Sequence, residues 1–135
     1  MGESGTLTQA NPRDDAARLR LVADMPVMLI AYDTGLRCLF ASRRLAEFFG
    51  FAAANIVGKH LREIIGEAPY QEVKPHFDRA LEGHCTSYRR TRVLDSGELR
   101  DLEVELVPDV GQDGRTRALF AVTTDVTERD RADTA

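Results

Sequence analysis

A period-two alternation in the last third of the chain constrains the fold most. From Asp101 to Leu106, aspartate or glutamate alternates with leucine or valine at every position. This spacing is typical of a β-strand with one buried face and one solvated face, and it is incompatible with the 3.6-residue period of a helix. The preceding segment, Cys85 to Leu94, is joined to it by Asp95-Ser-Gly97, a hairpin signal. The sequence therefore predicts an antiparallel hairpin here.

Opposite charges lie along the two segments of this hairpin. Antiparallel pairing is expected to bring the arginines of the first segment close to the acids of the second and to neutralise both sets. The residues concerned are Arg89, Arg90 and Arg92 on one side and Asp101, Glu103 and Glu105 on the other. A loop from Asp109 to Arg115 then leads to a last strand, Arg117 to Thr124.

The first third of the chain predicts a second hairpin. Val27 to Ala31 is continuously apolar, as expected of a strand covered on both faces, and Asp33-Thr-Gly35 is a turn into a strand from Arg37 to Ala41. Residues 1–13 are polar and predict a disordered lead. Residues 14–24 predict a short amphipathic helix, whose apolar stripe is Ala17, Leu21 and Val22.

Short helices are predicted between the two hairpins. Ser42 is a good N-cap for a helix that ends at Gly50, and one- or two-turn helices follow at residues 52–56 and 61–65. Residues 69–81 show a helical stripe, but Pro75 removes a backbone donor, so we expect a break there with Pro75 in the first turn of the longer helix. The fold class is α+β, with a five-stranded antiparallel sheet, short helices on one face and an N-terminal amphipathic helix.

Composition narrows the functional class. The chain has 135 residues, 43% of them hydrophobic, enough for one core, and a net charge of −4 with interspersed signs. A nucleic-acid partner would require a basic face, so none is expected. No apolar run approaches the roughly 20 residues of a membrane helix, and the two cysteines form neither a disulfide framework nor a zinc site. We expect one cytoplasmic domain at residues 14–129, followed by a helix or tail at residues 130–135.

The order of these segments resembles the PAS domain, in its ligand-sensor form from bacterial signalling proteins. The matching fragments span Leu21 to Arg129. They are Met25-Pro-Val-Met-Leu-Ile-Ala-Tyr-Asp33, Phe48-Phe-Gly50, Ile56-Val-Gly58-Lys59, Asp95-Ser-Gly-Glu98 and Asp125-Val-Thr-Glu-Arg129. Ser42 departs from the asparagine that the family usually has there, but serine also caps a helix.

The resemblance implies a sensory function. A cavity between sheet and helices would bind a small molecule or, alternatively, the domain would act without ligand as a dimerisation module. The candidate pocket residues are Phe40, Leu45, Phe48, Phe49, Ile56, Leu61, Ile64, Phe77, Tyr88, Leu102, Val104 and Phe120. Most of these are expected to pack as core, with Tyr88 as the main polar contact for a ligand. The resemblance also implies a relay at Asp125 and Thr127 into a helix, which Thr127 can cap, and on to an effector domain of kinase or regulator type.

Cofactor and enzyme functions are weaker alternatives. Covalent flavin binding in this family uses a cysteine where this chain has Gly58-Lys-His-Leu-Arg62, so a covalent flavin is not expected. Haem-binding members use a histidine on the long helix; His76 precedes Phe77 of the apolar stripe and should point about 100° away from it, so we favour a surface or capping role. No metal site or catalytic motif is present, and Asp33 is the one weak candidate for a small enzyme of a similar curved-sheet fold.

Overall fold

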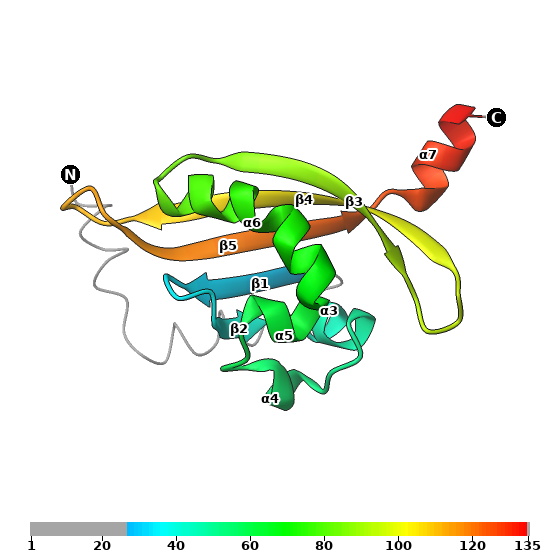
Figure 1. Cartoon of the computed structure of the whole chain (residues 1–135), viewed down its shortest axis with the longest axis horizontal. Helices are drawn as coiled ribbons and strands as arrows, with labels where there is room; N and C mark the ends of the chain where they lie inside the picture. Colours follow the sequence, from blue (N-terminus) through cyan, green and yellow to red (C-terminus); the bar gives the residue numbers. More distant parts are fainter. Residues whose placement is uncertain (1–26, 135) are drawn as a thin grey trace, which may run out of the picture.

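The computed structural model describes residues 27–134. Its single sheet has five antiparallel strands in the order β2-β1-β5-β4-β3 (Figure 1). The strands are β1 (Met28–Asp33), β2 (Cys38–Ala41), β3 (Thr86–Val93), β4 (Leu99–Val110) and β5 (Thr116–Asp125). The predicted lead at residues 1–13 and the predicted helix at residues 14–24 lie outside the described residues.

Short helices between β2 and β3 cover one face of this sheet (Figure 1). They are α3 (Arg43–Phe48), α4 (Ala53–Ile56), α5 (Leu61–Ile65) and α6 (Glu67–Leu81), and α7 (Thr127–Thr134) follows β5. The predicted α+β fold with a five-stranded antiparallel sheet and short helices is confirmed. Helix α7 begins at Thr127, three residues before the predicted start of a C-terminal helix or tail.

The core lies between the helices and the inner face of the sheet. Ile30 on β1 is the register partner of Ala121 on β5, and both are buried. Phe77 of α6 packs against them from the helical layer with 1% of its surface exposed. Since a strand's alternate residues share a face, this pattern fixes which side chains of every strand point toward the helices.

Pro75 does not break the long helix, contrary to the sequence-based expectation. Helix α6 runs continuously from Glu67 to Leu81, with Pro75 inside it. Pro75 is exposed, so the Gln71 carbonyl that loses its helical donor lies on the solvent side. The buried residues Val73 and Phe77 hold the helix against the sheet, and tertiary packing thereby outweighs the local penalty.

The expected neutralisation of the β3 arginines holds for Arg89 but is wrong for the other two. Arg89 is the register partner of Glu103, and its Nε lies 3.5 Å from the Glu103 carboxylate. Arg90 and Arg92, in contrast, are opposite Leu102 and Arg100. Residues at even positions of β3 point toward the helices, while the acids of β4 point the other way.

Candidate functional site

A small cavity lies where the helices meet the inner face of the sheet. Its floor comes from β1, β3, β4 and β5, and its other walls come from α3, α5 and α6. The lining residues are Ile30, Tyr32, Leu45, Phe49, Leu61, Ile64, Ile65, Phe77, Tyr88, Arg90, Leu102, Val104, Ala121 and Thr123. The cavity is therefore mainly apolar, with two phenols, one guanidinium and one hydroxyl.

Eight of the candidate pocket residues line this cavity. They are Leu45, Phe49, Leu61, Ile64, Phe77, Tyr88, Leu102 and Val104. Two others, Phe48 and Ile56, belong to the surrounding core instead: Ile56 is fully buried, and Phe48 packs on the core from the side. The structure thus brings eight of the twelve predicted residues together around one small cavity.

Phe40 and Phe120 lie on the opposite face of the sheet and do not line the cavity. Phe40 is the register partner of Ala31, and Ala31 is in turn the partner of Phe120. Directly opposite residues of neighbouring strands share one face, so these three side chains project away from the helices. Phe120 is 38% exposed there. Phe120 lies between the buried residues Leu119 and Ala121 in the sequence, and this alternation would have excluded it from the cavity.

Sequence reasoning missed six lining residues. They are Ile30, Tyr32, Ile65, Arg90, Ala121 and Thr123. The alternation of side chains along a strand could have identified most of them. Tyr32 is two residues from Ile30 on β1, and Thr123 is two residues from Ala121 on β5, so the members of each pair lie on the same face of the sheet. Arg90 likewise lies on the same face of β3 as Tyr88, but its charge led to the prediction that it faces solvent.

Two tyrosines and two phenylalanines, Tyr32, Tyr88, Phe49 and Phe77, form the aromatic part of the cavity. The Tyr32 ring meets the Phe77 ring edge-on at 5.7 Å between centroids, and Tyr88 lies 6.3 Å from Phe77. Burial raises the pKa of Tyr32 well above its ordinary value, with smaller contributions from Tyr88 and Cys38. Burial likewise raises the pKa of Tyr88. Both hydroxyls therefore keep their protons and can donate hydrogen bonds.

His76 lies beside the cavity rather than in its wall. Its ring stacks on Tyr88 at 4.8 Å between centroids with an interplanar angle of 21°. Tyr88, and not His76, is among the cavity-lining residues. Within residues 27–134, no three His, Cys, Asp or Glu side chains gather closely enough to hold a metal ion.

The cavity is narrow. Its volume is about 30 Å³, room for about two water molecules if each needs on the order of 10–15 Å³. The rim consists of half-buried side chains, namely Phe49, Ile65, Tyr88 and Arg90. A ligand larger than water would enter by moving these four side chains, all of which have rotatable bonds and partial access to solvent.

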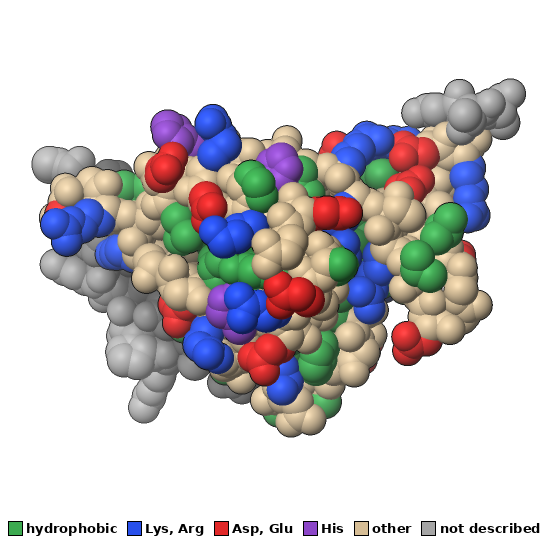
Figure 2. Space-filling view, viewed as in Figure 1, with side chains coloured by type: hydrophobic (Ala, Val, Ile, Leu, Met, Phe, Trp, Pro, Cys, Tyr) green, Lys and Arg blue, Asp and Glu red, His purple; other side chains and the backbone are tan. Residues whose placement is uncertain are grey.

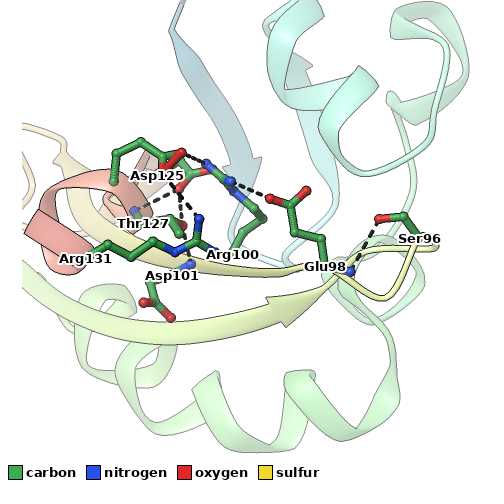
Figure 3. Close-up of polar contacts among 8 residues, drawn as sticks. Ser96, Glu98, Arg100, Asp101, Asp125, Thr127 and Arg131 are labelled. Carbon is green, nitrogen blue, oxygen red and sulfur yellow. Dashed lines mark hydrogen bonds and ion pairs between the residues drawn. The ribbon is translucent and has the colours of Figure 1, made fainter.

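A polar network joins the ends of β4 and β5 to α7 (Figure 3). The Asp125 carboxylate accepts hydrogen bonds from the Thr127 backbone N–H at 3.0 Å and from the Thr127 hydroxyl at 2.6 Å. The Thr127 hydroxyl accepts one from the Asp101 N–H at 2.8 Å. Arg100 Nε donates to the other Asp125 oxygen at 2.7 Å. The two predicted junction residues, Asp125 and Thr127, are thus in direct contact.

The capping role at this junction belongs to Asp125 rather than to Thr127. Thr127 is the first residue of α7, and the Asp125 side chain accepts from its backbone N–H. Burial alone would raise the pKa of Asp125, but hydrogen bonds from Arg100 and Thr127 outweigh it and lower that pKa. The hydrogen bond to Asp125 raises the pKa of Arg100 in return. The junction is therefore ionic at neutral pH.

The surface over the helices carries both signs of charge. Lys and Arg side chains are interspersed with Asp and Glu on the face drawn in Figure 2. Among the helices of residues 27–134, none is long and apolar enough to cross a membrane.

The comparisons with known proteins agree on the fold. The RNA-binding light-oxygen-voltage receptor superposes with a TM-score of 0.73 at 21% identity, over 93% of this chain and 36% of the receptor. The PAS domain of Bordetella pertussis BvgS gives 0.71 at 20% identity, over 90% of this chain and 92% of that domain. The VqmA–ligand–DNA complex of Vibrio cholerae gives 0.70 at 17% identity, over 83% of this chain and 51% of VqmA. No curated protein matches this chain.

These solved structures are all less than 25% identical to the chain, and they show its fold. The chain spans about a third of the length of the light-oxygen-voltage receptor and about half of VqmA, so the remaining parts of those proteins have no counterpart in it. The expectation of no nucleic-acid partner gains no support, because one similar structure is an RNA-binding receptor and another is a DNA complex. The sequence pattern of the PAS fold family matches residues 22–131, nearly the whole chain, and with the five-stranded sheet it shows that this protein belongs to the PAS fold family.

Proposed function

We propose that this domain is a cytoplasmic sensor that binds a small molecule in the cavity and relays its occupancy through α7 to an effector of kinase or regulator type. It acts as a binding module and not as an enzyme. The observation that carries the proposal is that one pair of strands builds both the cavity and the junction. Leu102 lines the cavity, and its register partner on β5 is Asp125.

The distance between the two sites along these strands is short. Thr123 lines the cavity two residues before Asp125, and Leu102 follows directly after Arg100 and Asp101, which bind the start of α7. A ligand that spreads or twists the inner faces of β4 and β5 would shift the hydrogen-bond donors and acceptors at α7. Such a relay requires two states with different ligand affinity, and the strand ends are where those states would differ.

A thermal-shift and native mass spectrometry screen against a metabolite library tests the binding step. A ligand that prefers the folded state raises the melting temperature progressively with its concentration. Ala121→Val places two methyl groups in the cavity, so the variant should lose both the shift and the bound mass. Val122→Ala, on the opposite face of the same strand, should keep them. A library without any stabilising compound, or equal loss in both variants, would contradict the proposal.

A second candidate function, dimerisation, is favoured by the outer face of the sheet. Three neighbouring apolar side chains are partly exposed on this face: Val107 at 42%, Phe120 at 38% and Val122 at 37%. Exposed apolar side chains grouped on one face are typical of a surface that binds another protein surface. Phe120→Glu should convert a dimer to a monomer in light scattering, whereas Asn55→Glu on α4 should leave the mass unchanged. A wild-type monomer at high concentration would exclude this function.

A further inference from the structure

We infer that the ligand of this cavity is a small carboxylate with an apolar body, whose carboxylate is bound by Arg90 together with the hydroxyls of Tyr32 and Tyr88. This inference rests on the proposed sensor function and deepens it by naming the ligand class. It is carried by three polar side chains that line one cavity and make no side-chain hydrogen bond to the described residues.

Arg90 is a half-buried cation without a hydrogen bond or ion pair to any residue of the described chain. It is placed on the inner face of the sheet because its register partner is Leu102. The adjacent Arg89, on the outer face, contacts both Glu103 and Asp130. A guanidinium has five N–H donors, and burying it unpaired is costly. Glu72 attracts Arg90 electrostatically, but no side chain of residues 27–134 forms an ion pair with it, so its N–H donors can bind an acceptor in the cavity.

Tyr32 is the second such group. It is 3% exposed and lines the cavity, and within residues 27–134 no side chain or backbone group makes a hydrogen bond to its hydroxyl. A buried tyrosine hydroxyl normally has a partner. Since this one lies in the cavity wall, a molecule in the cavity would supply that partner.

Tyr88 is the third, and it shares the β3 face with Arg90. Its ring lies near those of His76 and Phe77, with centroids 4.8 Å and 6.3 Å away, while its hydroxyl has no hydrogen bond in the described chain. Because burial raises the pKa of both tyrosines, the cavity presents donors at neutral pH. The complementary ligand group is rich in acceptors.

A second cation near the rim strengthens the case for an anion. Arg92 follows on the same face of β3, and its guanidinium lies 4.5 Å from the Phe49 ring centroid. Its Nε is buried without a hydrogen-bond partner. Burial lowers the pKa of Arg92, and repulsion from Arg90 lowers it further. An anion beside Arg90 would relieve this repulsion between like charges.

Among anionic groups, a carboxylate fits these donors best. Its two oxygens offer about four lone-pair sites, and it pairs with a guanidinium through two parallel hydrogen bonds. A phosphate would bring up to two charges into a wall with one unpaired guanidinium, and the second charge would be desolvated without a partner. A neutral amide or ketone would leave the Arg90 charge uncompensated.

The remaining walls specify the rest of the ligand. They are aliphatic, and the side chains that form them are Ile30, Leu45, Leu61, Ile64, Leu102 and Val104. Since the cavity is about 30 Å³ before the rim moves, the body is one ring or a short chain rather than a multi-ring cofactor. A monocarboxylate with a phenyl or short alkyl body matches the donors and the apolar walls once the rim side chains have moved to enlarge the cavity.

Calorimetry and thermal shift with matched acids and amides test this inference on the full chain. The probes are benzoate against benzamide and hexanoate against hexanamide at neutral pH. At least one acid should bind more than about tenfold more tightly than its amide, because a hydrogen bond between two charged groups is stronger than one to a neutral amide. Arg90→Met should abolish this preference, and Tyr32→Phe should reduce it. Arg89→Met, one residue away on the outer face, should leave it unchanged.

A measurement on the unmodified protein guards against a variant that fails to fold. The Arg90 Nε–H NMR signal, assigned by comparison with Arg90→Gln or by sequential assignment, should move on addition of the binding acid and stay with its amide. Equal affinity for acid and amide, or a preference that survives in Arg90→Met, overturns the carboxylate while leaving the sensor intact. Failure of every acid, amide and library compound to bind overturns both.

Discussion

A single buried hydroxyl joins the first strand to the first helix. Ser42 has none of its surface exposed. Its Oγ donates to the Val27 carbonyl at 2.5 Å and accepts from the backbone N–H of Leu29 at 3.1 Å and of Leu45 at 3.3 Å. The residue therefore caps α3 and closes the β1–β2 hairpin at the same time, which explains why serine can stand where the family usually has asparagine.

Replacing Ser42 by alanine should lower the free energy of unfolding by about 1–3 kcal/mol, the cost of leaving buried backbone donors unpaired. Urea unfolding followed by circular dichroism measures this change. Ser87→Ala, at an exposed position of β3, is the matched control and should change stability by less than about 0.5 kcal/mol. Equal stability of the two variants would show that the Ser42 network adds nothing beyond its neighbours.

His60 has a structural role at the start of α5. Its Nδ1 accepts from the Arg62 backbone N–H at 3.0 Å, and the His60 backbone N–H donates to the Glu63 carboxylate at 2.8 Å, so His60 and Glu63 form a capping box for α5. Burial lowers the pKa of His60 below its ordinary value of 6.5, and Arg62 and Arg37 lower it further. The cap requires the neutral imidazole.

The pH dependence of stability should report this cap. With a folded pKa below the unfolded one, the stabilisation is complete above pH 6.5 and is lost as the pH falls from 6.5 through the folded pKa. The melting temperature of His60→Asn should fall less than that of wild type between about pH 7.5 and pH 5, because asparagine caps without titrating. His84→Asn should behave as wild type. An identical slope in wild type and His60→Asn would disprove the role of this cap.

At the scale of elements, the sequence correctly predicted the strands, which depend on the alternation of apolar and polar residues. It did not predict features that depend on tertiary packing. The alternation from Asp101 to Leu106 correctly predicted β4, because a half-buried strand has only one way to place its apolar residues. The same rule, applied strictly to β3, would have turned Arg90 inward. Instead, the opposite charges of the two strands led to the prediction that Arg90 pairs with an acidic residue. The sequence alone does not show that a cavity lies on the inner face of β3.

The continuity of α6 could not be predicted from its own residues. Whether a proline breaks a helix depends on what the rest of the helix contacts, and those contacts come from β3, β4 and β5. The pocket set shows the same limit. The alternation along a strand assigns each side chain to one face of the sheet. Which of the inward side chains line the cavity and which pack in the core depends on the helices that cover them.

Pro75→Ala should therefore stabilise the protein, because it restores the hydrogen bond to the Gln71 carbonyl in a helix that already exists. A gain of about 1–3 kcal/mol in the free energy of unfolding is expected, since proline in a helix interior is about 3 kcal/mol worse than alanine and restricts the unfolded chain in part compensation. Pro69→Ala is the control. Pro69 lies in the first turn of α6, where its missing N–H has no helical acceptor, so no comparable gain should appear.

At the scale of the whole molecule, the two faces of the sheet have different surroundings. Its inner face holds the cavity, and its outer face carries Phe120 and Val122, each directly next in sequence to an inward residue. Side chains of β5 thus alternate between the cavity wall and the outer surface, and the strand ends at Asp125, next to α7. Any movement of β5 would reach the cavity, the outer face and the junction together, which makes this strand the natural path for a relay.

Asp125→Asn tests whether the junction holds α7 to the sheet. The variant keeps the size of the side chain but loses the charge that binds Arg100 at 2.7 Å, and it weakens the cap on the Thr127 N–H. Backbone amides of α7 should then exchange with deuterium at least about fivefold faster, as expected for loss of a cap worth about 1 kcal/mol. Amides of β1 should not change, because they are paired with β2 and β5 away from the junction.

The control variant is Asp109→Asn, which removes a carboxylate that pairs with Arg117 near the opposite ends of β4 and β5. Helix α7 of this variant should exchange as in wild type. Faster exchange throughout the sheet in Asp125→Asn would indicate global destabilisation, whereas unchanged exchange in α7 would mean that Asp125 does not hold the helix and that the relay must leave the domain elsewhere.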